Sequence, residues 1–123
     1  MSEQNRVDFI IDSERRLVIA KFGEHLTAAD IQTYVINLKA NPSFDPSFSE
    51  IADISDLNEL PVEASDFVEL ADSTDPFSLD SKRAFVAQTP LQQHAAQIHK
   101  LLRNQRNFGI FETRAEAEAW IKN

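Results

Sequence analysis

Three threonines predict where helices begin in this chain, and they constrain its fold more than any other feature. Thr27, Thr89 and Thr113 each follow a short apolar run and have a polar residue three positions later. Those polar residues are Asp30, Gln92 and Glu116. In a capping box, the threonine oxygen accepts a hydrogen bond from a free backbone N–H of the first turn, and the partner side chain bonds back to the N–H of the cap. The repeated order of strand, cap and helix indicates an α/β domain.

We expect one α/β domain over residues 1–123, with a mixed, mostly parallel five-stranded sheet packed by four helices in the order ββαβαβαβα. The expected strands are residues 7–12, 16–22, 50–54, 82–87 and 108–111, and the expected helices are residues 27–40, 62–71, 90–104 and 114–122. The short polar link at residues 13–15 predicts an antiparallel hairpin between the first two strands. The fourth strand shows almost no polar alternation beyond its start, which is typical of a buried parallel strand.

Composition excludes several classes of site. The chain has no cysteine, so it has no disulfide, no thiolate metal site and no cysteine nucleophile. Its first residues hold no basic segment followed by an apolar core, so we expect no signal peptide. No apolar run approaches the roughly 20 residues of a transmembrane helix. We therefore expect a cytoplasmic protein without a transmembrane segment.

The middle of the chain is strongly acidic. Residues 40–81 contain eleven acidic residues and no lysine or arginine, within a chain of net charge −8. The acids are Asp45, Glu50, Asp53, Asp56, Glu59, Glu63, Asp66, Glu69, Asp72, Asp75 and Asp80. Such a region repels phosphate backbones, so we expect no nucleic-acid binding through it. It predicts a basic protein partner, or, as the simpler alternative, a solvated surface that keeps the protein soluble.

Five short segments spread over most of the chain carry a resemblance to a known family. They are Gly23 with Leu26-Thr27, Asn41-Pro42-Ser43-Phe44, Ala52-Asp53-Ile54-Ser55, residues 82–87, and Ile110-Phe111 with residues 115–121. In these segments the chain resembles the SpoIIAA-like group of bacterial proteins, which is related to STAS domains and anti-sigma-factor antagonists. The resemblance implies a single SpoIIAA-like domain acting as a non-enzymatic regulatory module that binds a protein partner. One branch is similar to lipid carriers of the Sec14 type, so the alternative is a carrier or sensor of a small apolar ligand.

The chain departs from this family at its phosphorylated serine. The antagonists carry an Asp-Ser-Ser-Gly type motif after the third strand, whereas this chain has Glu63-Ala64-Ser65-Asp66 there, without a glycine. A phosphate on Ser65 would add negative charge among neighbouring carboxylates. We therefore expect no working phosphoserine switch, and Ser65 and Glu63 remain candidate partner contacts.

Ligands of parallel sheets bind beyond the carboxyl ends of the strands. The loops expected at that edge contribute acids and a histidine, but no lysine or arginine. These residues are Glu24, His25, Asp56, Glu59 and Glu112. The chain has only two glycines and no Gly-rich phosphate loop, so we expect no nucleotide cofactor.

Asp53, Ser55 and Asp56 follow one another at the end of the third strand and could serve as base, nucleophile and orienting acid. Ser55 lacks the glycine-flanked elbow of a hydrolase serine, so turn residues that bond the local backbone are the favoured interpretation. His94 and His99 are five residues apart, whereas helical metal pairs are three or four apart. We therefore expect no catalytic residue, no cofactor and no metal site.

Three aromatic residues are unusual because they lie in expected loops. Phe44, Phe48 and Phe77 precede strands, so they belong to the end of the sheet opposite the capped helices. One interpretation is that they close the open end of the core, which is common for loop aromatics in small domains. The other is a hydrophobic rim that meets a partner, a lipid or a second copy of the chain in a homodimer.

Overall fold

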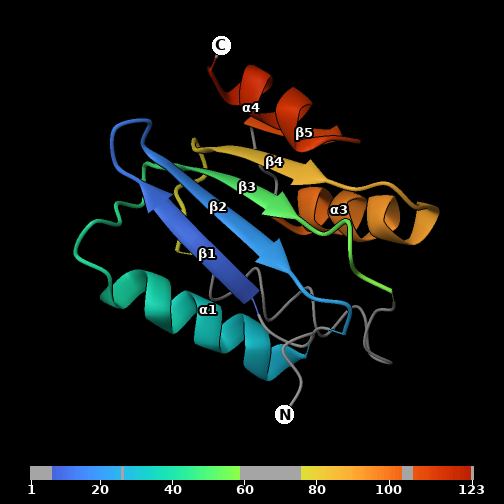
Figure 1. Ribbon diagram of the computed structural model, residues 1–123, viewed down its shortest axis with the longest axis horizontal. Helices are drawn as coiled ribbons and strands as arrows, with labels where there is room; N and C mark the ends of the chain where they lie inside the picture. Colours follow the sequence, from blue (N-terminus) through green and yellow to red (C-terminus); the bar gives the residue numbers. More distant parts are fainter. Residues whose placement is uncertain (1–6, 26, 59–75, 104–106, 123) are drawn as a thin grey trace.

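The computed structural model describes residues 7–25, 27–58, 76–103 and 107–122 as an α/β fold built on a five-stranded sheet (Figure 1). The strands are β1 (Val7–Asp12), β2 (Leu17–Phe22), β3 (Ser49–Asp53), β4 (Lys82–Val86) and β5 (Asn107–Phe111). The described helices are α1 (Ala28–Ala40), α3 (Pro90–Arg103) and α4 (Arg114–Lys122).

The strands lie side by side in chain order. β1 pairs with β2 antiparallel, and the other neighbours are parallel. This confirms the predicted α/β class, the hairpin and the mixed, mostly parallel sheet. The predicted helix over residues 62–71 lies outside the described residues.

All three predicted capping boxes are confirmed. They are formed by Thr27 with Asp30, Thr89 with Gln92, and Thr113 with Glu116. At α1, the Thr27 hydroxyl accepts from the Asp30 N–H at 3.2 Å, and the Asp30 carboxylate accepts from the Thr27 N–H at 2.9 Å. Each box satisfies donors that a helix start leaves without an intrahelical acceptor, so it fixes where the helix begins.

The sheet separates two cores. α1 and α3 cover one face, and α4 covers the other over β3, β4 and β5 (Figure 1). Successive strand residues serve opposite faces, as Ile19 packs with the α4 core and Ala20 with the α1 core. The α4 core contains Ala117 fully buried, with Trp120 and Ile121 partly buried against it.

The aromatic residues of the two loops pack together at one end of the larger core. The Phe44 ring lies 6.3 Å from Phe48 and 5.3 Å from Phe77 between centroids, both edge-on. Phe48 and Phe77 are buried, and Phe44 is half-buried against the same core. The structure thus places these rings in the core, so Phe48 and Phe77 have little surface to offer a partner or a lipid.

A buried ion pair lies beneath these rings. The Glu50 carboxylate accepts hydrogen bonds from the Arg83 guanidinium at 2.6 and 2.9 Å and from the Tyr34 hydroxyl at 2.6 Å. The Arg83 guanidinium stacks over the Phe77 ring at 4.4 Å. Glu50 and Arg83 are both buried. The expectation that the acids of residues 40–81 form a surface is therefore wrong at Glu50, which is charge-balanced inside the protein, and also at Asp53, which is buried as well.

We predict that Arg83→Met destabilises the protein by about 3–5 kcal/mol, because it leaves the Glu50 carboxylate buried without its cation. Combining it with Glu50→Gln removes that charge and keeps an acceptor for Tyr34. Urea unfolding should show the double variant to be more stable than Arg83→Met alone. A double variant less stable than Arg83→Met would contradict the assignment of Glu50 as a buried charge.

Gly109 in β5 allows the packing of α4. A Cβ atom there would lie 2.6 Å from the Phe111 ring and 3.6 Å from Trp120. The Phe111 ring in turn packs on Trp120, with ring centroids 5.6 Å apart. The absence of a side chain at position 109 therefore makes room for the aromatic pair that holds α4 on the sheet.

We predict that Gly109→Ala destabilises the protein by about 1–3 kcal/mol, the usual cost of overpacking. In a Phe111→Leu background the same change should cost less, because the clashing ring is gone. Thermal unfolding of the four proteins of this cycle measures the coupling. Equal costs in both backgrounds would show that Phe111 does not limit the space at Gly109.

Candidate functional site

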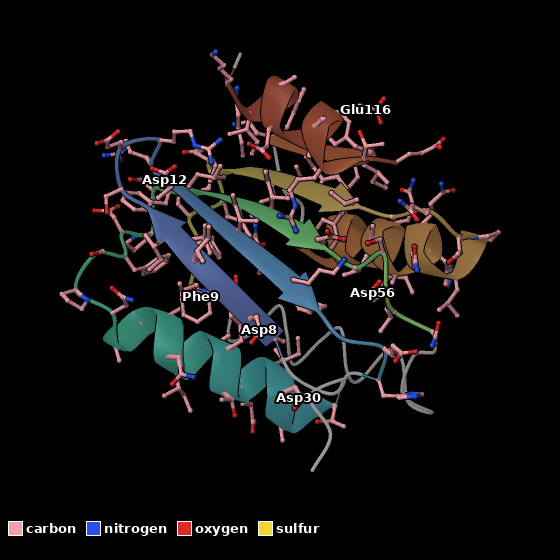
Figure 2. All side chains as sticks on the ribbon, in the orientation of Figure 1. Asp8, Phe9, Asp12, Asp30, Asp56 and Glu116 are labelled. Atoms are coloured by element: carbon pink, nitrogen blue, oxygen red, sulfur yellow. The ribbon has the colours of Figure 1, made fainter. Side chains whose placement is uncertain are left out.

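Charged residues gather at the carboxyl edge of the parallel strands. Lys21 in β2 and Asp53 in β3 are direct neighbours in the strand register. Each follows by two positions a residue of the α4 core, so both lie on the α4 face. Figure 2 shows Asp56 beyond the end of β3, whereas Asp12 lies at the opposite end of the sheet. We call Lys21, Asp53, Ser55, Asp56 and Arg114 the Asp53 cluster.

Asp53 is the centre of this cluster, and its side chain is only 7% exposed. Its Oδ1 accepts from the Ser55 N–H at 3.0 Å and the Ser55 hydroxyl at 2.6 Å. Its Oδ2 accepts from Lys21 Nζ at 3.3 Å and Arg114 Nη2 at 3.1 Å. Two bonds at each oxygen use the full acceptor capacity of a carboxylate. Asp53 therefore connects the turn after β3, the end of β2 and the start of α4.

These contacts lower the pKa of Asp53. Burial by itself would raise the pKa, because it disfavours the charged form. The hydrogen bonds from Ser55, the charge of Lys21 and the hydrogen bond from Arg114 outweigh burial, so the pKa lies below its ordinary value. Asp53 is therefore ionised at neutral pH and holds both cations in place.

The other charged side chains of the cluster reach solvent. Lys21, Arg114 and Asp56 are 38%, 43% and 57% exposed. Lys21 Nζ also donates to the Ser55 hydroxyl at 3.1 Å and lies 3.5 Å from Asp56 Oδ2. The cluster therefore presents both signs of charge on a buried anionic support.

Gln92 of α3 fixes the loop that carries Ser55. Its buried side chain donates from Nε2 to the carbonyls of Ser55 and Leu57, both at 3.0 Å. Its Oε1 accepts from the N–H groups of Gln88 and Thr89 at 2.7 and 3.1 Å. Gln92 therefore both caps α3 and anchors the turn after β3. The three-residue spacing from Thr89 predicts only the first of these roles.

The lowered pKa of Asp53 makes this carboxylate better suited to forming ion pairs than to abstracting a proton. The Ser55 hydroxyl donates to Asp53, but a carboxylate with a lowered pKa is a weak general base. Lys21 Nζ lies 3.3 Å from Asp53 Oδ2 and 3.5 Å from Asp56 Oδ2, so it forms ion pairs with both carboxylates. In the part of the chain that the structure describes, no group of three or more metal-ligating side chains could hold a metal ion.

The structure brings some predicted site residues together and separates others. Asp53, Ser55 and Asp56 meet at the carboxyl edge. The aromatic candidates Phe44, Phe48 and Phe77 pack in the core at the opposite end. Glu59, Glu63 and Ser65 lie outside the described residues.

The loops at the carboxyl edge contain no lysine or arginine, but two cations reach this edge from the neighbouring strand and helix. Lys21 reaches it from the end of β2, and Arg114 reaches it from the first residue of α4. Both residues lie next to these loops in the sequence. One sequence signal could have found Arg114, since an arginine directly after the Thr113 cap faces the positive end of the helix dipole.

Comparisons of the chain with models of known protein families, with curated proteins and with solved structures gave no match. Among the described helices, none has the length and apolar character needed to cross a membrane. The SpoIIAA-like resemblance thus stays an interpretation of the sequence.

We predict that Asp53→Asn lowers stability at pH 7 by about 1–3 kcal/mol, because an amide cannot replace the charge that Lys21 and Arg114 share. A carboxylate with a lowered folded pKa contributes stability above its unfolded pKa and loses it as the pH falls through the folded pKa. The difference from the native protein should therefore be constant above about pH 5 and shrink below about pH 4.

Denaturant unfolding at pH 7, 5 and 3 measures this difference, with Asp56→Asn as the control at an exposed position. The control should differ little from the native protein at every pH, because exposed ion pairs contribute little. A difference between Asp53→Asn and the native protein that grows towards pH 3 would contradict the lowered pKa.

Proposed function

We propose that this chain is a non-enzymatic, SpoIIAA-like and STAS-related regulatory module of the cytoplasm that binds a protein partner through the Asp53 cluster. The finer architecture belongs to the same proposal, with a fourth helix over residues 62–71 completing the order ββαβαβαβα. The module works without a phosphoserine switch at Ser65. The observation that carries the proposal is the group of half-exposed charges held on buried Asp53 at the carboxyl edge of the sheet.

The geometry supports protein binding because the charged groups are already ordered. Lys21 and Arg114 are both bonded to one buried carboxylate, which restrains their side chains before any partner arrives. Side chains that are ordered in advance lose less entropy on binding. Charges of both signs at fixed places select the partner and orient its approach by electrostatic complementarity.

The number of acidic residues in the chain does not by itself predict the charge of the partner, because the edge of the sheet carries both cations and anions. Of the acids in residues 40–81, Glu50 and Asp53 are buried and paired with cations of the same chain. Glu59, Glu63 and the acids up to residue 75 lie outside the described residues. A basic partner stays a prediction for that part of the chain.

The carrier alternative has less support from the described residues. An apolar carrier needs side chains that line a space for its ligand. The aromatic residues that could form such a lining, Phe44, Phe48 and Phe77, pack against one another in the core. The homodimer was predicted from the same three aromatic residues, on the assumption that they form an exposed hydrophobic rim. The homodimer stays a prediction.

We predict that the double variant Lys21→Gln with Arg114→Gln loses its partner and remains folded, although it is less stable because the buried Asp53 carboxylate loses both cations. The matched control is Lys39→Gln with Lys122→Gln, which removes the same charge at two exposed positions of α1 and α4. Affinity capture from the native cell extract, followed by quantitative mass spectrometry, compares both variants with the native chain. A true partner should drop at least tenfold with the cluster variant and by less than twofold with the control.

The captured protein must then bind the purified chain directly, measured by titration calorimetry with the same variants. Circular dichroism checks that both variants are folded. A partner bound equally by all three proteins would place the interaction elsewhere. Turnover of a captured small molecule would contradict the non-enzymatic assignment.

A further inference from the structure

Arg114 occupies a position that local helix energetics disfavour. It is the first residue of α4, directly after the Thr113 cap. The helix start carries partial positive charge, so a carboxylate is favoured there and a cation is not. Departures from local rules concentrate at functional sites. Asp53 compensates this one, because it binds Arg114 at 3.1 Å across the sheet edge.

The guanidinium of Arg114 retains most of its binding capacity. Within the described ranges, Nη2 alone is engaged, by Asp53 Oδ2. The remaining N–H groups have no acceptor among the described residues, and the side chain is half-exposed. A guanidinium presents its donors as a planar fork that matches the two oxygens of a carboxylate. A single contact with Asp53 therefore orients the fork and leaves donors for an incoming anion.

Two further groups add positive potential at this place. Lys21 Nζ lies 3.3 Å from the same Asp53 Oδ2, so one carboxylate oxygen serves two cations. The N–H groups of Arg114 and Ala115, in the first turn of α4, have no acceptor within the helix. The nearby acids are Asp56, which lies 3.5 Å from Lys21, the exposed Glu112, and Glu116, which is occupied by the Thr113 cap.

We infer that Arg114, with Lys21 and the first turn of α4, binds a carboxylate on an acidic segment of the protein partner. This inference rests on the proposed function and names the chemistry of the partner's contact. A singly charged, planar carboxylate fits the fork of Arg114. Asp56, Glu112 and Asp53 repel a doubly charged phosphate more strongly than a singly charged carboxylate, so between these two anions the site favours the carboxylate.

The probe is a hexaglutamate peptide, acetylated and amidated at its ends, titrated into the full ¹⁵N-labelled chain and followed by NMR. The expected shift changes are confined to residue 21, residues 53–56 and residues 112–116. Arg114→Gln should weaken binding at least fivefold. Arg114→Lys should weaken it by at least twofold, because it keeps the charge and loses the fork. The control Lys122→Gln, at the other end of α4, should leave affinity within 1.5-fold.

Several results would overturn the inference. Equal affinity for the native chain and Arg114→Gln would do so, as would shift changes centred on another surface. Displacement of the peptide by inorganic phosphate at lower concentration than by acetate would assign the site to phosphate. Binding of a hexalysine peptide, without binding of hexaglutamate, would show that the site takes a basic segment and not an acidic one.

The two proposals fail separately. If the captured partner depends on Lys21 and Arg114 but hexaglutamate does not bind, the partner-binding function stands and the carboxylate inference falls. If hexaglutamate binds through Arg114 but no captured protein depends on the cluster, the carboxylate site stands and the proposed function falls.

Discussion

Reciprocal capping of the helices is the interaction on which the rest of this structure depends. Thr27, Thr89 and Thr113 each set the first turn of the helix that follows one of the parallel strands β2, β4 and β5, so three helices start at the same edge of the sheet. The caps also place functional groups. The partner of Thr89, Gln92, holds the loop that carries Ser55, and the residue after Thr113 is Arg114. The first turns of α3 and α4 therefore contribute to the candidate site, whose other residues come from β2, β3 and the turn after β3.

Two buried carboxylates show how similar pairings lead to different roles. Glu50 is enclosed with Arg83 and Tyr34 under the aromatic residues, so its charge is neutralised where solvent does not reach. Asp53 is as buried, but its two cations extend to the surface. The first arrangement stabilises one packing of the core. In the second arrangement, the buried carboxylate restrains two exposed cationic side chains, Lys21 and Arg114.

The fold was largely predictable because its signals are local. Capping spacing, the hairpin link and the apolar strands each act within a few residues, and the structure confirms them. The site was only half predictable. Asp53 and Ser55 are neighbours in sequence, but Arg114 meets Asp53 across 61 positions and Lys21 across 32. Those contacts depend on the order and register of the strands. Counting acids also failed at Glu50, because a count of charges carries no information on burial.

The pKa of Asp53 connects the stability of the cluster with its use. Because the carboxylate remains charged well below neutral pH, Lys21 and Arg114 keep their positions throughout the range from about pH 5 to 8. Moderate acidification therefore does not disassemble the cluster. Salt acts on its exposed parts instead, since charges separated in solvent are screened within about 8 Å at physiological ionic strength. A partner held by this edge should thus be released by rising salt before it is released by falling pH, and that difference follows from placing the anion inside and the cations outside.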